Sequence, residues 1–171
     1  MMYWFIGILL CFFLLFLSSF SVWNVYAIIR GAPFVPSTNK RVGTMIDLAN
    51  LQKTDVLLDL GSGDGRILRR VAPFVKEARG IEINPSLAVW SRMINMFVKE
   101  KNIQVLCSDF WHQDLSDVDI IFVYCIDNKM NKLETKVKKE MKPGSRVVSN
   151  EFKFSNWKPG QEQDGVRLYL V

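Results

Sequence analysis

The sequence predicts a doubly wound, mostly parallel α/β sheet preceded by one membrane-spanning helix. Three observations support this. The first 29 residues contain no Asp, Glu, Lys, Arg or His. After them, short apolar runs alternate with segments of helical periodicity, the pattern of a parallel sheet covered by helices. With 171 residues, 49% hydrophobic and 23% charged, the chain fits one compact domain and is neither collagen-like nor largely disordered.

Residues 1–30 form the predicted transmembrane anchor. A bilayer core is ~30 Å thick and needs about 20 apolar residues of helix. Trp4 and Trp23 are 19 positions apart, which is ~28 Å along a helix. Both therefore suit the aromatic belts at the two membrane surfaces. Residues 31–37 (GAPFVPS) contain two prolines and are expected to be a linker, so that the soluble domain covers residues 38–171.

A cleaved signal peptide is the alternative for the same segment. It fits less well, because no basic residue precedes the apolar stretch, the stretch is long, and no clear small-residue cleavage site follows. Arg30, Lys40 and Arg41 come after the span, and no basic side chain comes before it. The positive-inside rule then predicts a single-pass membrane protein whose C-terminal domain is cytoplasmic.

The soluble domain divides into alternating helices and strands. Ser37 or Thr38 can cap the first helix, and Pro85 suits the first turn of the third. Helices are expected near residues 38–51, 66–73, 85–97 and 127–141. Strands are expected at residues 55–60, 79–83, 103–107, 119–125, 146–152 and 166–171. The helix after Pro85 carries an apolar stripe formed by Leu87, Val89, Trp90, Met93, Ile94, Met96 and Phe97.

In such a sheet, ligands bind beyond the carboxyl ends of the strands. The first strand is followed by DLGSGDGR (59–66), whose glycines allow a tight turn and a close approach of backbone to ligand. The helix that follows suits an anion, whereas Asp59 and Asp64 suit a cation. The G-x-G-x-G spacing is neither the dinucleotide fingerprint nor a phosphate loop. A zwitterion such as S-adenosylmethionine therefore fits better than a pyrophosphate.

Acidic residues also follow the next two strands. Glu82 can accept hydrogen bonds from two ribose hydroxyls. Asp109 can accept from an exocyclic amine, and apolar neighbours such as Phe110 can pack against a purine. Each of these residues alone is ordinary, since a glutamate there is usually solvated and an aspartate often forms a turn. Together, in this order, they predict a nucleoside site. Three cysteines without a CxxC motif and a single histidine predict no metal site.

Several motifs resemble known enzymes. DLGSGDGRI (59–67), GIEINP (80–85) and SDFW (108–111) are similar to the first three nucleotide-site motifs of class I S-adenosylmethionine-dependent methyltransferases, whose fold is Rossmann-like. PFVPS (33–37), KPGSRVVSNEF (142–152) and NWKP (156–159) resemble a smaller group within that class. This group includes prokaryotic members and the membrane-associated mitochondrial lysine methyltransferases that modify the ATP synthase c-subunit and the adenine nucleotide carrier.

The resemblance implies a set of cofactor-binding residues. The methionine end of S-adenosylmethionine would contact Asp59, Gly61, Ser62, Gly63 and Gly65. The ribose would contact Glu82, and the adenine would lie beside Ile83, Asn84, Asp109 and Phe110. The chain departs from the wider class at two points. YCID (124–127) is not the D/N-P-P-Y motif of enzymes that methylate bases, and the chain ends one strand after Glu151, which predicts a sheet shortened at the C-terminus.

We expect the enzyme to methylate a lysine of a membrane protein. The amine must be neutral to react, and Asp127 after the fourth strand and Glu151 after the fifth are the candidate bases. A helix cap or a surface acid is the ordinary role of either residue. The lysines between residues 129 and 142 form a solvated face or contact anionic lipid headgroups. Two alternatives stay open: a lipid or hydrophobic small molecule as acceptor, and a non-catalytic, membrane-tethered nucleoside-binding module. No nucleic-acid partner is expected.

Overall fold

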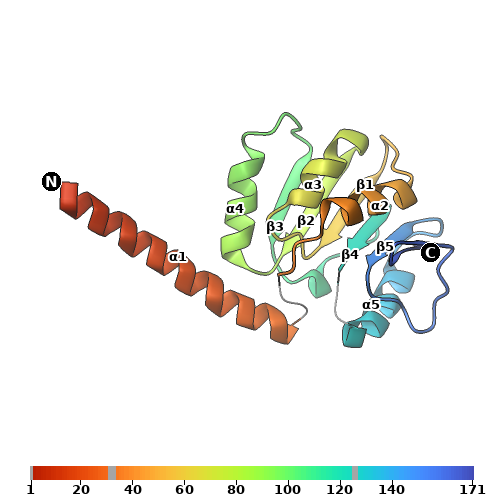
Figure 1. The fold of residues 1–171 in the computed structure, drawn as a ribbon. Coiled ribbons are helices and arrows are strands. Elements are labelled where there is room, and N and C mark those ends of the chain that lie inside the picture. Colours follow the sequence, from red (N-terminus) through yellow and green to blue (C-terminus); the bar gives the residue numbers. More distant parts are fainter. Residues whose placement is uncertain (1, 31–33, 125–126) are drawn as a thin grey trace.

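The computed structural model describes residues 2–30, 34–124 and 127–171. Its centre is a seven-stranded sheet with the strand order β3-β2-β1-β4-β5-β7-β6 (Figure 1). The strands are β1 (Val56–Leu60), β2 (Glu77–Glu82), β3 (Ile103–Cys107), β4 (Ile120–Val123), β5 (Arg146–Asn150), β6 (Gln161–Gln163) and β7 (Val166–Leu170). The first five run parallel, and β7 is antiparallel to both of its neighbours. The predicted doubly wound, mostly parallel sheet is confirmed.

The two middle strands are apolar because they are covered on both faces. Every residue of β1 (VLLDL) and of β4 (IIFV) is buried, and the strands pair in the register Leu57↔Ile120 to Leu60↔Val123. Branched side chains on such a strand pack against helices above and below the sheet. The polar exception, Asp59, lies near the carboxyl end of β1, where ligand sites of this fold occur.

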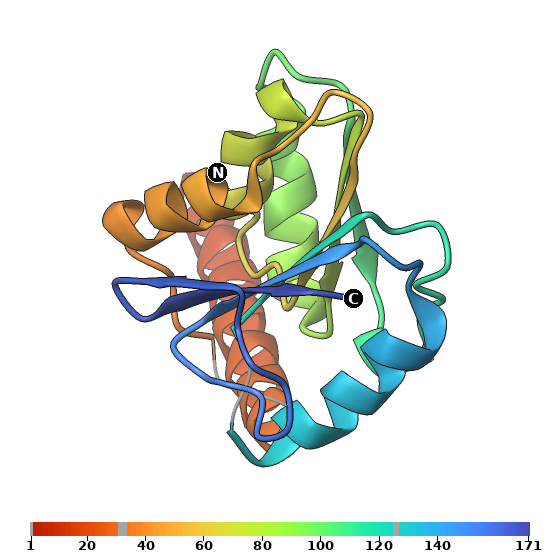
Figure 2. The same cartoon turned by 90° about the vertical axis from the view of Figure 1, so that its right-hand side faces the viewer.

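Helices cover both faces of the sheet. They are α2 (Asn39–Ala49), α3 (Arg66–Val71), α4 (Pro85–Asn95) and α5 (Asp127–Glu140), with short 3-10 turns η1 (Ala72–Phe74) and η2 (Phe110–His112). One core joins residues of α2, α3 and α4 to the sheet, and a second joins α5 to its opposite face. Figure 2 shows α2 and α5 on opposite sides of the strands. Thr38 caps α2, and Asn84 caps α4, where Pro85 occupies the first turn.

The prediction of a shortened sheet was wrong. The sequence pattern missed β6, because its three residues, Gln-Glu-Gln, are polar and exposed and form no apolar run. β6 pairs with β7 through a two-residue turn in which Asp164 and Gly165 both have positive φ, at 50° and 74°. An Asp-Gly pair is a strong hairpin signal, since this turn type requires positive φ at both positions. That signal could have revealed the seventh strand.

The N-terminal helix α1 (Met2–Arg30) projects from the domain (Figure 1). It contains a stretch, Tyr3–Tyr26, that is long and apolar enough to cross a membrane. It is therefore compatible with a single span. In its C-terminal half α1 packs against α4, where the hydroxyls of Ser19 and Ser86 share a hydrogen bond of 3.2 Å. Part of the predicted linker, residues 31–33, lies outside the described residues.

Candidate active site

A pocket lies at the carboxyl ends of β1, β2, β3 and β4. It is lined by the motifs at the ends of these strands and, on the N-terminal side, by Asn24 and residues 34–37, which form its N-terminal wall. The residues that line it include Asp59, Gly61, Ser62, Gly63, Glu82, Ile83, Asn84, Asp109, Phe110 and Tyr124 from the domain, and Asn24, Phe34, Val35, Pro36 and Ser37 from the N-terminal side. The place of the pocket is the one expected for a ligand in a doubly wound sheet.

The glycine loop after β1 is tied to β2. The amides of Gly61 and Ser62 both donate to the Ile81 carbonyl, each at 2.9 Å. Gly63 has φ +55°, and a Cβ at this position would come within 2.5 Å of the Phe34 ring. Only glycine allows this backbone conformation together with so close a ring. The loop and the N-terminal segment are therefore packed together at the pocket.

Glu82 connects the loop to the start of α4. Its carboxylate accepts hydrogen bonds from the amides of Gly63 at 2.7 Å and Asn84 at 2.8 Å. Burial raises the pKa of Glu82, although these backbone donors oppose the shift. Each carboxylate oxygen has more than one acceptor position, so the group can still accept bonds from a ligand. Two hydroxyls of a ribose match this capacity.

Asp59 is buried without a partner for one of its oxygens. The Oδ2 atom has no hydrogen bond within the described chain. Burial, together with the negative charges of Glu82 and Asp64, raises the pKa of Asp59 to about 7. A cationic ligand group would favour the ionised form and supply the missing partner. Ser62 Oγ and Asn84 Nδ2, which also belong to pocket-lining residues, are likewise buried and unpartnered. The pocket is thus built for a polar ligand with a positive group, which S-adenosylmethionine satisfies.

Asp109 and Phe110 lie at the end of β3. The Asp109 side chain accepts a hydrogen bond from the Trp111 amide at 3.0 Å and so caps the short turn η2. The Phe110 and Trp111 rings contact each other, with centroids 4.5 Å apart. Because η2 begins directly after the strand, Asp109 and Phe110 both line the pocket. An acceptor beside an aromatic ring suits a purine with an exocyclic amine.

The structure brings together all the predicted cofactor residues except Gly65, which does not line the pocket. Gly65 has φ +77° and stands before the first turn of α3, where a Cβ would come within 2.1 Å of Ser91 Oγ. Its role in the structure is therefore to let the chain turn into α3 close to Ser91 of α4. Which of these residues contact the cofactor stays a prediction.

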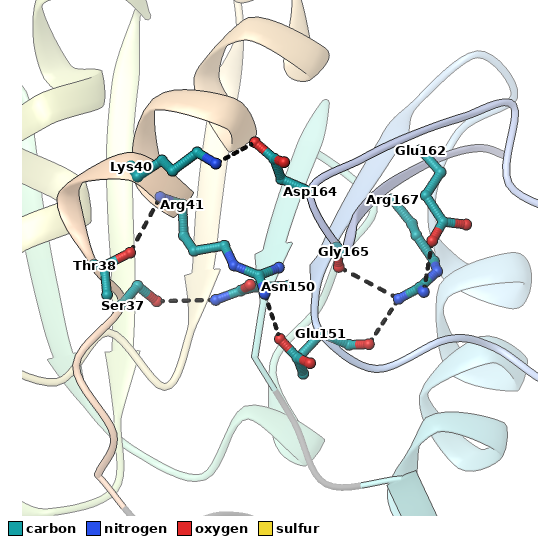
Figure 3. A network of polar contacts seen from close by, with 10 residues as sticks. All are labelled: Ser37, Thr38, Lys40, Arg41, Asn150, Glu151, Glu162, Asp164, Gly165 and Arg167. Atoms are coloured by element: carbon teal, nitrogen blue, oxygen red, sulfur yellow. Dashed lines mark hydrogen bonds and ion pairs between the residues drawn. The ribbon is translucent and has the colours of Figure 1, made fainter.

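The two candidate bases are placed differently. Glu151 follows β5 with φ +71°, and its carboxylate pairs with Arg41 of α2 at 2.9 Å (Figure 3). Its side chain is about half exposed and does not line the pocket. The preceding residue, Asn150, donates to the hydroxyl of Ser37 in the pocket wall at 3.2 Å. Asp127 begins α5, but its side chain is not described, and Cys125 and Ile126 lie outside the described residues.

Sequence reasoning missed the N-terminal wall of the pocket. Asn24 lies in the predicted anchor, and Phe34, Val35, Pro36 and Ser37 lie in the predicted linker, yet all five line the pocket. The Pro-flanked aromatic Phe34 is a signal that this segment has a fixed conformation. Its contact with Gly63, 29 positions later, is long-range and is not encoded in local spacing. Tyr124, at the end of β4, also lines the pocket, although the sequence pattern gave it no binding role.

This fold and this site define an S-adenosylmethionine-dependent methyltransferase. Comparisons with known proteins agree: the chain belongs to the family of the ANTKMT methyltransferase domain, whose family model matches residues 59–161. A solved structure, that of an RNA methyltransferase from Salinibacter ruber in complex with S-adenosyl-L-homocysteine, superposes with a TM-score of 0.73 and 31% identity. The match covers 80% of this chain and 92% of that one. The non-catalytic alternative is therefore set aside.

Two curated relatives are informative. A protein-lysine N-methyltransferase of Saccharolobus islandicus is 35% identical over 154 residues, which cover 81% of this chain and 93% of the relative. A lysine N-methyltransferase of the ATP synthase c-subunit from Xenopus laevis is 30% identical over 143 residues, which cover 80% of this chain. The match spans 62% of the Xenopus protein, so that protein is considerably longer than the matched region.

Proposed function

We propose that the chain is a membrane-anchored protein-lysine N-methyltransferase whose acceptor is a lysine of a membrane protein. The relatives from Saccharolobus islandicus and Xenopus laevis support the lysine, since both are named as lysine N-methyltransferases. The proposal that the enzyme acts at a membrane rests on the N-terminal wall of the pocket. Asn24 of α1 and the segment Phe34 to Ser37 line the same pocket as the nucleotide-site motifs. If α1 spans a bilayer, the pocket opens beside the membrane surface.

The chain's own residues supply binding and positioning. S-adenosylmethionine, when bound, supplies a methyl group on a positively charged sulfonium. Glu82 would hold the ribose, and Asp59 would face the cationic part of the methionine end. The loop from Gly61 to Gly63 and the ring of Phe34 enclose this end of the pocket. Such positioning is a large part of catalysis when the leaving group is already good.

The acceptor amine must lose its proton before it reacts. A lysine has a pKa of about 10.4 in water, and burial next to a positive charge favours its neutral form. Glu151 and Asp127 are the proposed proton acceptors. Arg41 holds the Glu151 carboxylate next to Asn150, which itself contacts the pocket wall. A proton acceptor at this place would serve a lysine that enters between the N-terminal wall and the end of β5.

We also propose that the domain lies on the cytoplasmic side. The support is the position of basic residues, because Arg30, Lys40 and Arg41 closely follow the apolar segment. Basic residues close to a span are retained in the cytoplasm.

The test is methyl transfer from radiolabelled S-adenosylmethionine into membranes of a strain that lacks the enzyme, to which the purified full-length chain is added in detergent. We expect label in a protein band, and mass spectrometry should place the added methyl groups on a lysine side chain. The matched control is Glu82→Ala, which should bind the donor weakly and transfer little label.

The other fractions separate the alternatives. Label in the lipid extract would contradict the proposal and favour a lipid or a hydrophobic small molecule as acceptor. Label in the RNA fraction would contradict it as well and would align the chain with the Salinibacter protein, whose structure is described as an RNA methyltransferase.

A further inference from the structure

The outward side of α4 and of the turn after it is apolar and exposed. Five large side chains lie on it, with exposed fractions that range from 48% at Trp90 to 87% at Phe97. We call this group the outer stripe: Val89, Trp90, Met93, Met96 and Phe97. The sequence indicated an apolar stripe here, and the structure shows that of these predicted positions only Leu87 is buried. A large exposed apolar surface indicates a binding partner.

The helix buries its opposite side against the sheet. Leu87, Ala88 and Ser91 face the core and are at most 6% exposed. Positions 89, 90, 93, 96 and 97 follow helical spacing and lie on the other side of the helix. α4 is therefore apolar on two sides, and packing against the sheet accounts for only one of them.

The outer stripe is continuous with the place where α1 contacts the domain. Ser86, whose hydroxyl shares the hydrogen bond with Ser19 of α1, precedes Trp90 by four positions and Met93 by seven. These spacings put Ser86 on the same side of α4 as the stripe. Figure 1 shows α4 at the edge of the domain that faces α1. Whatever surrounds α1 therefore also lies next to the stripe.

The depth of this contact matches a membrane surface. Ser19 stands seven positions before Tyr26, the end of the apolar stretch. Seven residues of helix correspond to ~10 Å. Amphipathic helices that lie in the membrane plane bury their apolar side ~5–10 Å deep, at the boundary between headgroups and acyl chains. An α1 that spans the bilayer would hold the start of α4 at that depth.

The charges around the stripe suit anionic lipid. α4 contains no Asp or Glu, and the exposed side chains of Arg92, Lys99 and Lys101 lie on it or on the turn that follows. Glu100 is the one acid among residues 85–101. Basic side chains beside an apolar stripe interact with anionic headgroups while the apolar groups enter the acyl region.

We propose that the outer stripe of α4 inserts into the bilayer surface beside α1 and forms a second membrane contact. The proposal rests on the membrane anchor put forward under the proposed function. With one spanning helix, the whole molecule can still rotate about the helix axis and tilt in the bilayer. A second contact fixes the domain, so that the pocket between α1, the N-terminal segment and the strand ends keeps one orientation to the membrane.

The test measures depth with a spin label. The full-length chain, with Cys11, Cys107 and Cys125 replaced by serine, receives one new cysteine by Met93→Cys. It is reconstituted in vesicles of phosphatidylcholine and phosphatidylglycerol. Collision rates with oxygen, which concentrates in acyl chains, and with a water-soluble nickel chelate then report the environment of the label. Leu14→Cys in α1 is the reference for lipid, and Lys139→Cys, exposed on α5, is the reference for water.

We expect the label at position 93 to resemble the label at position 14, with high oxygen and low nickel accessibility. A label at 93 that resembles 139, while 14 stays in lipid, would overturn the inference and leave the anchor standing. A label at 14 that is open to nickel would overturn the anchor and the inference together. The spectrum of the label at 93 would be broadened if two labels lay close together. Broadening that persists after dilution with lipid would also overturn the inference, because the stripe would then contact a second copy of the chain.

Binding of S-adenosylhomocysteine by each labelled variant shows whether it has folded. If Met93→Cys fails to fold, Phe97→Cys takes its place, because this side chain is 87% exposed and its replacement leaves no cavity.

Discussion

Burial and the neighbouring carboxylates strongly shift the pKa of Asp59. Its folded-state pKa of about 7 exceeds the ordinary 3.8. The folded state therefore favours the protonated carboxyl. The stability that this form contributes is complete below about pH 4 and is lost as the pH rises through 7. Asparagine at this position cannot ionise. We predict that Asp59→Asn unfolds at a higher temperature than wild type at pH 8 and that the difference shrinks at pH 5, by thermal unfolding in detergent without cofactor. A difference that does not change with pH would contradict this account.

The same substitution should weaken cofactor binding. A hydrogen bond to a charged group contributes about 1.5–3 kcal/mol. We therefore predict at least a tenfold loss of S-adenosylhomocysteine affinity in Asp59→Asn at pH 8, measured by calorimetry. In the wild type, affinity should rise from pH 5.5 to pH 8 as Asp59 ionises. Equal affinity of variant and wild type at pH 8 would show that Asp59 does not face the ligand.

Glu151 permits a separate test at the residue scale. Glu151→Gln keeps the size of the side chain and removes its negative charge. We predict a large loss of turnover with unchanged S-adenosylhomocysteine affinity, because Glu151 does not line the pocket. Arg41→Gln is the matched variant, since it removes the partner of the carboxylate but leaves the carboxylate itself. Glu151 is the proton acceptor if Arg41→Gln still shows a turnover that rises with pH while Glu151→Gln shows little turnover at any pH. Unchanged turnover in Glu151→Gln would exclude that role.

The pocket-lining motifs could be predicted because each lies at the carboxyl end of a strand or directly after it. The position of a strand end is local information, and the parallel sheet then collects Asp59, Glu82 and Asp109 at one edge. The N-terminal wall of the pocket could not be predicted, because it depends on the contact of Phe34 with Gly63, which lies far along the chain. The exposure of Glu151 and its ion pair with Arg41 depend on the packing of α2 beside β5 and β7, which no local pattern specifies.

At the scale of elements, the side chain of Arg146 joins the sheet to the end of α2. Arg146 of β5 donates to the carbonyls of Ala49 and Asn50 at the end of α2, and pairs with Asp55 at 2.6 Å. Asp55 is buried, so loss of Arg146 leaves an unpaired charge in the interior. We predict that Arg146→Met costs about 3–5 kcal/mol of unfolding free energy, measured by urea unfolding.

The exposed pair between Lys40 and Asp164 provides the control. Lys40 is 76% exposed, and surface pairs contribute about 0–1 kcal/mol. Lys40→Met should therefore change the unfolding free energy little. Adding Asp55→Asn to Arg146→Met should recover part of the loss, since the buried charge is then absent. Equal costs for Arg146→Met and Lys40→Met would contradict the assigned role.

Element prediction succeeded where apolar runs are long and failed where they are absent. β1 and β4 are recognisable because burial on both faces requires apolar residues at every position. β6 is polar and short, and only its turn marks it. The stripe of α4 is visible in the sequence, but periodicity cannot tell which of two apolar sides faces the core.

At the scale of the whole molecule, α1 is independent of the cores that fold the domain. None of its residues belongs to either core cluster of the described chain. We predict that the double variant Leu9→Arg, Leu14→Arg leaves the carbonate-resistant membrane fraction, because an arginine at the centre of a span costs about 2.5–3.5 kcal/mol. Its affinity for S-adenosylhomocysteine should stay within about twofold of wild type. A variant that remains in the pellet would contradict the span.

We propose that the acidic and glycine positions along one edge of the sheet together bind S-adenosylmethionine. Isothermal calorimetry with S-adenosylhomocysteine, performed on the folded full-length chain in detergent, tests it most directly. We expect one ligand to bind per chain and the heat to be abolished in Glu82→Ala. A folded wild-type chain that gives no heat with this ligand would contradict it.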